Sequence, residues 1–359
     1  MTTPPLNAPG RPQIQVDGTR AERLEADLIR LEARADAAGV ASLEAVFLNW
    51  GSREQGQPVD YVHFHQAAID FGKRLSIGFE VTGQLQTVFD GLITGIGAAY
   101  PELRPPELTL LAEDALAGLR YRRRTRLSEN LADGDIASTI LGDAGLRADV
   151  GRSGASHVEL WQVNEDELGA LRARSGDALI ELRDGSVHVT EPASLTATPL
   201  RLTRENNLIR FTVLADLAHQ RGEVRVHGYD VAAKEAIHER AGADAVRPEA
   251  SRGRLGPDVV TRVFANAAED LHLEAPATGA EARSLAEAAL RRRARRFVRG
   301  TGVTLGTPEL HVGARIELVD LGPWFAGIYL VTAVTHRFDQ VEGYRTEFEA
   351  QRPDLGEAS

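Results

Sequence analysis

The stretch that decides the fold reads Gly306-Thr-Pro-Glu-Leu-His-Val-Gly313, then Arg315-Ile-Glu-Leu-Val319, Phe325-Ala-Gly-Ile-Tyr-Leu-Val-Thr-Ala-Val-Thr-His336 and Tyr344-Arg-Thr-Glu-Phe-Glu-Ala350. It contains three runs with apolar residues at alternate positions, separated by glycine turns, which is the pattern of β-strands. The last two runs predict a β-hairpin. No run carries a nucleophile, a metal-ligand cluster or a phosphate-binding loop. The stretch therefore predicts a β-barrel without an attached active site, and it favours an architectural protein over an enzyme.

The composition is that of a globular chain with two or three domains, since 359 residues are 43% hydrophobic and 26% charged. No apolar run approaches the roughly 18 residues that a membrane span needs, so we expect no direct membrane insertion. The first ten residues lack a basic region followed by an apolar one, so we do not expect Sec export. Cysteine is absent, which excludes disulfides and thiolate metal sites. The net charge of −11 argues against general affinity for nucleic acid or anionic membranes.

Further strand signals precede this stretch. Alternating runs separated by Gly and Pro occupy 42–50, 71–81, 87–96 and 107–113 in the N-terminal part, and 200–202, 208–213 and 222–231 later in the chain. Short strands at this spacing predict closed barrels or sandwiches. From Ala232 to Arg299 the β-propensity is low, and Glu281 to Val298 predicts a helix. The second β unit is therefore expected to be split by an insertion.

The segment Arg20 to Ala38 is rich in Glu, Arg, Leu and Ala, while its larger apolar residues are sparse. It predicts a short, mostly solvated helix. A linker helix is favoured over a partner-binding helix, because the apolar face is narrow.

The middle of the chain predicts a small α/β block. Asp114 to Leu119 predicts a short helical segment, and Asp133 to Leu146 predicts a helix with an acidic start and a glycine near its end. Asn164 to Arg174 predicts another helix, with Asn164 as the N-cap. Ala178 to Val189 predicts a hairpin, because the pair Asp184-Gly185 supplies the positive φ angles of a type I′ turn.

Several patterns invite a site interpretation that the surrounding residues do not support. His63 and His65 point to one face of a strand, but no third ligand completes a metal shell. Asp133-Gly-Asp135 lacks the rest of a calcium loop, so helix capping is favoured. Gly300 to Gly306 follows a helix and opens strands, the reverse of a phosphate loop. Gly151-Arg-Ser-Gly154 does not meet the nucleophile-elbow pattern. We expect no catalytic site, no metal and no cofactor.

Two arginine clusters stand out. The first comprises Arg120, Arg122, Arg123, Arg124 and Arg126, and the second comprises Arg291, Arg292, Arg293, Arg295, Arg296 and Arg299. One interpretation is contact with phosphate or an acidic partner, and the other is a solvated helix face that pairs with Glu281 and Glu287. On an acidic chain, protein contacts or solvation are favoured over nucleic acid.

The order of these segments resembles the phage late control D family, the gp27-like tail hub that also forms the front of type VI secretion VgrG proteins. The six stretches that carry the resemblance are Val88-Phe-Asp-Gly-Leu-Ile-Thr-Gly95, Leu110–Leu119 with the arginine-rich 121–126, Leu131–Leu146, Trp161–Leu168, His227-Gly-Tyr-Asp-Val231 and Gly306–Ala350. One departure is Leu168-Gly169, where the family usually has Phe-Leu. The resemblance covers roughly residues 40 to 352.

The resemblance implies a mainly β fold with α+β parts: two tube-like antiparallel β-barrels, a small α/β domain between them and a partly helical insertion in the second barrel. The expected regions are a leader with a short helix at 1–39, the first barrel at 40–113, the α/β domain at 114–192, the second barrel at 193–232 and 300–353, the insertion at 233–299 and a tail at 354–359.

The resemblance also implies a function as the baseplate hub of a contractile tail or injection system. Three chains would form a pseudo-sixfold ring that joins a trimeric spike to a hexameric inner tube, as part of a phage tail or phage-tail-like particle assembled in the bacterial cytoplasm. The chain carries no spike segment or lysozyme insertion, so the spike is expected to be a separate protein, and other baseplate components are further partners. The alternative is a β-rich polysaccharide hydrolase whose acids the sequence does not single out.

Ring formation is expected to use the strands around Val88–Ile96 and Phe325–His336, and neighbour contacts are expected to use the arginine clusters. The candidate interface residues are Val88, Phe89, Ile93, Ile96, Arg122, Arg123, Arg124, Arg292, Arg295, Arg296, Phe325, Tyr329 and Val331.

Overall fold

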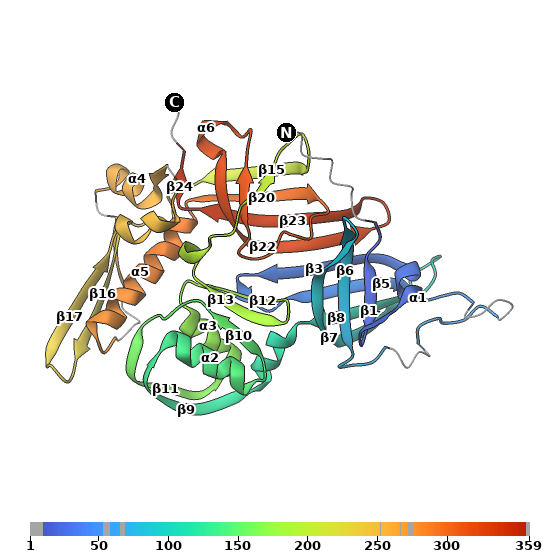
Figure 1. Cartoon of the computed structure of the whole chain (residues 1–359), viewed down its shortest axis with the longest axis horizontal. Helices are drawn as coiled ribbons and strands as arrows, with labels where there is room; N and C mark the ends of the chain where they lie inside the picture. The colour runs from blue at the N-terminus through green and yellow to red at the C-terminus, as the bar shows by residue number, and fades with distance from the viewer. Residues whose placement is uncertain are drawn as a thin grey trace.

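A computed structural model gives the fold of the chain, and it describes residues 10–52, 58–64, 69–251, 253–265, 267–271 and 276–356 (Figure 1). Its largest element is one 13-stranded sheet. Eleven strands follow one another along it: β15 (Leu208–Ala215), β20 (Val298–Leu305), β23 (Gly343–Arg352), β22 (Gly327–Asp339), β3 (Leu28–Asp36), β5 (Ser42–Leu48), β8 (Glu107–Glu113), β7 (Gln84–Ala99), β6 (Arg74–Val81), β1 (Gln13–Val16) and β2 (Thr19–Arg20). The remaining two, β21 (Arg315–Leu318) and β14 (Leu200–Leu202), attach beside β22.

The sheet has two halves, each with its own apolar core. One cluster, which includes Phe47, Ile77 and Phe79, lies among the strands β1, β3, β5, β6, β7 and β8. The C-terminal strands pack around another that includes Leu318 and Tyr329. In Figure 1 the C-terminal strands, in orange and red, lie above the blue N-terminal strands. The mainly β class, with several sheets, is confirmed. The pairing path has two ends among the described residues, so these strands do not close into a ring of hydrogen-bonded pairs.

The two halves are joined by antiparallel pairing of β3 with β22, from Ala333 opposite Asp36 to Asp339 opposite Arg30. A second link is a ring stack: Phe79 of β6 lies parallel to Tyr344 of β23, with their centroids 3.6 Å apart. Gly306 makes room for this tyrosine, because a Cβ at that position would lie 2.0 Å from the ring. The C-terminal hairpin therefore takes part in both cores.

The prediction of a helix over Arg20 to Ala38 is wrong for most of this segment. Only α1 (Glu22–Asp27) is helical, and β3 follows it directly. A bulge between Leu28 and Arg30 shifts the register against β5 and so hides the two-residue period. Residues 13–36 thus contribute strands of the main sheet, which corrects the expected leader boundary at residue 39. The part of that leader at residues 1–9 lies outside the described residues.

The strands expected from the other alternating runs are confirmed, with small boundary shifts. They correspond to β5, β6, β7, β8, β14, β15 and β16 (Glu223–Asp230). The C-terminal hairpin is also confirmed as β22 paired with β23.

The middle block packs around an apolar core of its own. Its elements are the 3₁₀ segment η1 (Ala115–Tyr121), the ribbon of β9 (Arg123–Ala132) with β11 (Ser156–Asp166), the helices α2 (Asp133–Asp143) and α3 (Glu167–Ser175), and a sheet of β10 (Arg147–Val150), β13 (Ser186–Thr190), β12 (Leu179–Arg183) and β4 (Ala38–Gly39). Positive φ angles at Asp184 (51°) and Gly185 (72°) confirm the hairpin turn. Asp166, and not Asn164, caps α3, since its Oδ1 accepts the Gly169 N–H at 2.8 Å.

A separate three-stranded sheet corrects two further expectations. It joins β16 to β17 (Glu235–Ala241) and β19 (Ala268–Leu271), although β16 was expected in the second barrel and 232–299 was expected to be poor in strands. Helix α5 (Gly279–Arg295) covers this sheet, because its small residues Ala282, Ala286 and Ala289 let it approach closely. The shorter elements are η2 (Pro192–Ser194), η3 (Ala243–Ala245), η4 (Arg247–Glu249), β18 (Arg254–Leu255), α4 (Gly256–Val263), α6 (Gly322–Phe325) and β24 (Asp354–Leu355).

Replacing Tyr344 tests the contact between the two halves. Tyr344→Ala removes the ring stack and leaves a cavity, so we expect it to lower the free energy of unfolding by about 3–5 kcal/mol. Tyr344→Phe keeps the ring and loses only the hydrogen bond between the hydroxyl and His336 Nδ1 (2.7 Å), with an expected cost of about 1–2 kcal/mol. Urea unfolding followed by circular dichroism measures both. Equal, small losses in the two variants would contradict the role of the stack.

Candidate functional site

Three of the five arginines in the first cluster surround one buried carboxylate, and a fourth, Arg120, lies 2.6 Å from Glu113 instead. Glu167, at the start of α3, is 0% exposed. Its Oε2 lies 2.6 Å from Arg122 Nε, and its Oε1 lies 3.0 Å from Arg124 Nε and 3.8 Å from Arg126. Arg123 instead donates to Asn164 on the neighbouring strand. These arginines thus hold the β9–β11 ribbon against α3, with Arg123 and Arg124 still exposed.

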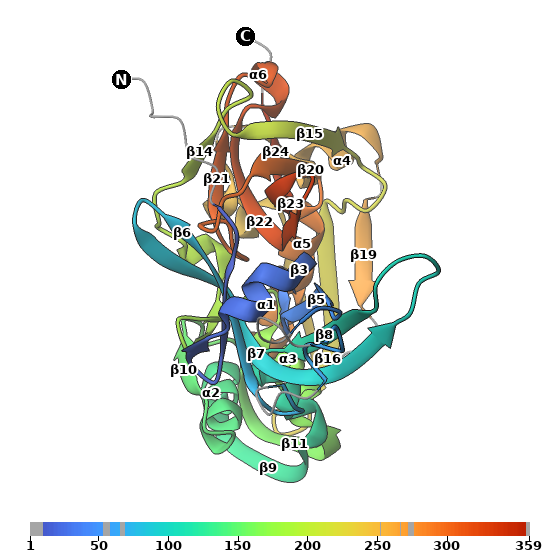
Figure 2. The same ribbon diagram turned by 90° about the vertical axis from the view of Figure 1, so that its right-hand side faces the viewer.

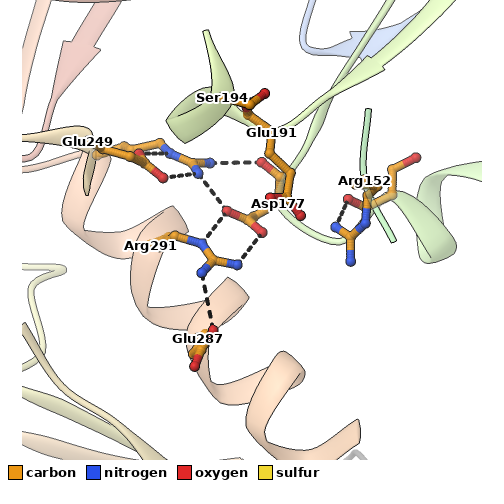
Figure 3. Close-up of polar contacts among 9 residues, drawn as sticks. Arg152, Asp177, Glu191, Ser194, Glu249, Glu287 and Arg291 are labelled. Carbon is orange, nitrogen blue, oxygen red and sulfur yellow. Dashed lines mark hydrogen bonds and ion pairs between the residues drawn. The ribbon is translucent and has the colours of Figure 1, made fainter. Parts of the chain in front are cut away.

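Two arginines of the second cluster, Arg291 and Arg295, form a buried junction between α5 and the middle block (Figure 3). Arg295, only 4% exposed, is bidentate to Glu249, with Nε–Oε2 at 2.5 Å and Nη2–Oε1 at 2.6 Å. It also donates through Nη1 to the Asp177 carbonyl at 2.8 Å. Arg291, one turn earlier, grips the Asp177 carboxylate through Nε at 2.9 Å and Nη2 at 3.1 Å. The Arg–carboxylate fork fixes direction as well as distance, so the junction sets how α5 meets the middle block.

The charge states of this junction follow from its geometry. Burial alone would raise the pKa of Asp177, but the hydrogen bonds and charges of Arg291 and Arg295 outweigh it and lower the pKa. Burial alone would lower the pKa of Arg295, but Glu249 and Asp177 outweigh it and raise that pKa. Asp177 and Arg295 therefore stay ionised across the physiological range.

A second junction places His157 of β11 between two carboxylates. Its Nε2 lies 2.9 Å from Asp133 Oδ1 at the start of α2, and its Nδ1 lies 3.1 Å from Glu281 Oε1 on α5. Hydrogen bonds to Asp133 and then to Glu281 raise the pKa of His157 to about 9, despite its burial. Arg174 also reaches Asp133 Oδ1, at 3.2 Å. The imidazolium thus ties three elements together at neutral pH.

Several candidate interface residues are buried inside the chain. The side chains of Phe89, Ile93, Tyr329 and Val331 lie in the two sheet cores. With Arg295, these side chains serve packing within the chain. Whether their strands meet a partner stays a prediction.

The other candidates are at least partly accessible. Val88 and Phe325 are half-buried, and Ile96, Arg292 and Arg296 are exposed. Whether they take part in partner contacts stays a prediction.

Exposed aromatic residues form a surface that the sequence analysis missed. Trp50 and Tyr100 follow the ends of β5 and β7, and they meet Tyr61, with centroid distances of 5.3 and 6.3 Å. Phe64 stacks on the same tyrosine at 5.0 Å. Half-exposed Trp and Tyr side chains are typical of protein–protein contacts. Tyr61 and Phe64 are neighbours in the sequence, but Trp50 and Tyr100 lie far from them along the chain, so the four residues give no periodic signal.

The patterns considered for metal or phosphate have structural roles. His63 is buried, and its Nε2 lies 3.0 Å from Asp27 Oδ2, whereas His65 lies outside the described residues. Asp133 joins the His157 junction, and 300–305 belongs to β20. Among the described residues, no group of three or more His, Cys, Asp or Glu side chains is placed to hold a metal ion. No helix in the described part of the chain is both long and apolar enough to cross a membrane.

A family model described as the Alg8 N-terminal domain matches residues 59–340. The chain belongs to this family. No curated protein matches it in sequence.

The fold of this member of the Alg8 N-terminal domain family is similar to the folds of several tail proteins with solved structures. A 43 kDa tail protein of prophage MuSo2 from Shewanella oneidensis is 12% identical, with a TM-score of 0.69 over 96% of this chain and 99% of that protein. A tail protein from Neisseria meningitidis MC58 is 14% identical, with a TM-score of 0.62 over 95% and 96%. The E. coli protein c3393, a type VI secretion component described as similar to the T4 tail proteins gp27 and gp5, is 14% identical, with a TM-score of 0.59 over 96% and 79%. The resemblance to gp27-like tail proteins is thereby confirmed at the level of the fold.

Removing Arg295 tests the buried junction. Arg295→Ala leaves Glu249 without its cation and Asp177 with one partner fewer, so we expect a loss of about 3–5 kcal/mol in the free energy of unfolding. The matched control is Arg296→Ala, an exposed neighbour, with an expected change within about 0.5 kcal/mol. Chemical denaturation measures both. Similar effects of the two substitutions would contradict the structural role of the junction.

The His157 junction predicts that the folded state loses stability at alkaline pH. A histidine whose pKa rises on folding stabilises the folded state. Its contribution is complete below the pKa of the unfolded chain, near 6.5, and is lost as the pH rises through the folded-state pKa of about 9. We expect the free energy of unfolding to fall by up to about 3 kcal/mol over this window in the wild type, and to fall far less in His157→Gln. The control is His188→Gln, which changes a partly exposed histidine. A wild-type profile parallel to that of His157→Gln would rule out this linkage.

Proposed function

We propose that this chain is the structural baseplate hub of a contractile tail or injection system. Three copies form a ring of pseudo-sixfold symmetry around a channel and join a trimeric spike to a hexameric inner tube. The observation that carries the proposal is the likeness of the whole fold to tail proteins, over 96% of this chain and 99% of the Shewanella protein. The likeness to the type VI component c3393 points the same way.

The physical argument concerns symmetry. A sixfold surface and a threefold surface cannot mate through equivalent contacts, so an adaptor must present both symmetries. In this proposal each half of the main sheet is one barrel-like module, and three chains supply six modules. The two apolar cores and the strand pairing that joins the halves support this division. The middle block and the α5-covered sheet lie beside the modules in Figure 1, where they are free to meet other baseplate components.

The partners in this proposal are further copies of the chain, a separate spike protein, the tube protein and neighbouring baseplate proteins, in a particle assembled in the bacterial cytoplasm. The hub acts through interfaces and needs neither a catalytic site nor a cofactor. The polysaccharide hydrolase alternative has no specific observation in its favour among the described residues.

The mass and shape of the purified protein test the ring. We expect light scattering to give three copies, and negative-stain imaging to show a ring with a central channel, for the chain alone or co-expressed with its spike and tube proteins. Ile96→Glu places a charge on an exposed apolar residue of β7 and should shift the mass to that of one copy. Val341→Glu, at an exposed turn, is the control and should not.

The proposal would be contradicted if the protein remained monomeric in the presence of the spike and tube proteins, or if it were a monomer that cleaves glycans. If the Ile96→Glu variant still formed a ring, the hub proposal would stand, but this part of β7 would not belong to the contact between copies.

A further inference from the structure

Half of strand β7 has an unpaired edge. Residues Gln84 to Leu92 pair with β6 on one side, whereas pairing with β8 begins only at Leu92 and continues to Ala99. Along Gln84 to Gly91, no described strand occupies the second side. In Figure 2 the β6–β7 hairpin reaches out from the body of the sheet. An open edge presents backbone N–H and C=O groups that are ready to accept another strand.

A cavity of about 830 Å³ runs along this edge. Eight consecutive residues, Leu85 to Leu92, line it. Successive side chains of a strand point to opposite faces, so a cavity on one face would meet only every second residue. Because all eight consecutive residues line the cavity, we infer that it lies along the edge of β7 and not over one face of the strand. The opposite wall comprises 181–185 and 308–311, and Asp36, Asp114 and His336 are also part of the lining. Its volume lies within the range of about 300–1,000 Å³ that is typical of binding pockets.

The lining is acidic, with six carboxylates (Asp36, Asp90, Asp114, Glu181, Asp184 and Glu309) against three arginines (Arg74, Arg147 and Arg183). Arg74 is bound to Asp90, and Arg183 lies within ion-pair distance of Glu181 and Asp184. Asp36 and Glu309 are exposed and form no ion pair with a described cation. Asp114 is buried, both of its oxygens accept backbone N–H groups, and burial raises its pKa to about 7, so it is not available to an occupant. A cationic occupant would therefore gain contacts that the chain itself does not make.

We propose that this groove binds an extended, basic polypeptide segment of a partner protein, which adds a strand to the free edge of β7 at Gln84–Gly91. The eight edge residues span about 26 Å, which suits an extended chain better than a compact small molecule. Main-chain pairing supplies affinity, and arginine or lysine side chains facing Asp36 and Glu309 supply the preference for charge. The groove belongs to a single chain, so the proposal goes beyond the hub function. Because residues 88–91 also lie in the strand expected to form the ring, binding is measured on the single-copy Ile96→Glu variant as well as on the wild type.

Hydrogen exchange with a synthetic strand tests the proposal. The probe is an eight-residue peptide that alternates valine with arginine or threonine, added to the full chain. We expect it to slow amide exchange at 84–91 by about tenfold or more at saturation, and elsewhere in the chain much less. The first control is the same peptide N-methylated at every second residue, which keeps the charge and blocks main-chain pairing. The second control replaces its arginines by glutamates.

Variants of the chain separate charge from edge pairing. Asp36→Asn with Glu309→Gln should weaken binding of the arginine peptide about fivefold, since the two acidic contacts are lost. The matched control, Glu235→Gln with Glu342→Gln, removes two exposed acids elsewhere and should leave the affinity unchanged.

Three results would overturn the proposal: no slowing of exchange at 84–91 with the arginine peptide, equal slowing by the N-methylated peptide, or equal binding of the glutamate peptide. The first result would mean that the groove holds only water and binds no strand. Each can occur whether or not the chain forms a ring, so failure of the groove and failure of the hub are told apart.

Discussion

The antiparallel pairing of β3 with β22 is the contact on which the rest of the structure depends. Seven residue pairs along it turn two separate β units into one sheet, and they bring residues 28–36 beside the C-terminal hairpin. Because β22 and β23 reach into the first core through Phe338 and Tyr344, neither half buries its apolar surface without the other. The main sheet is thus a single unit with two apolar cores. The hub proposed above, with one module in each half, would need such a rigid connection.

The polar junctions have a different task, which is orientation. Buried ion pairs contribute little net stability, because the cost of removing charges from water offsets most of their attraction. They are directional, however, and a broken pair is costly. The forks of Arg291 and Arg295 on Asp177 and Glu249, together with His157 between Asp133 and Glu281, therefore hold α5 in one position against the middle block. For the proposed function as an adaptor, fixed angles between these blocks would matter more than added stability.

Local signals were enough to predict much of this fold. Strict alternation identified β5, β8 and the C-terminal hairpin, and Asp184-Gly185 identified the turn between β12 and β13. They failed at β3, where a bulge hides the alternation and helix-favouring residues are held in a strand by neighbours on both sides. The arginine clusters were visible in the sequence, but their carboxylate partners Glu167, Asp177 and Glu249 lie far away along the chain. Neither the aromatic cluster around Tyr61 nor the free edge of β7 has a sequence signal, because both depend on which strands lie side by side.

A disulfide cross-link tests the joined sheet most directly, since the chain has no cysteine of its own. Arg34 and Thr335 are directly opposite each other in the β3–β22 pairing. Opposite residues of an antiparallel pair have Cα atoms about 4.5–5.5 Å apart, within the span of a disulfide. We expect Arg34→Cys with Thr335→Cys to form an intramolecular disulfide in the folded protein under mild oxidation, seen as the loss of two hydrogens by mass spectrometry. We expect the out-of-register pair Arg34→Cys with Arg337→Cys to stay reduced. Efficient cross-linking of the second pair, or failure of the first, would contradict the single sheet.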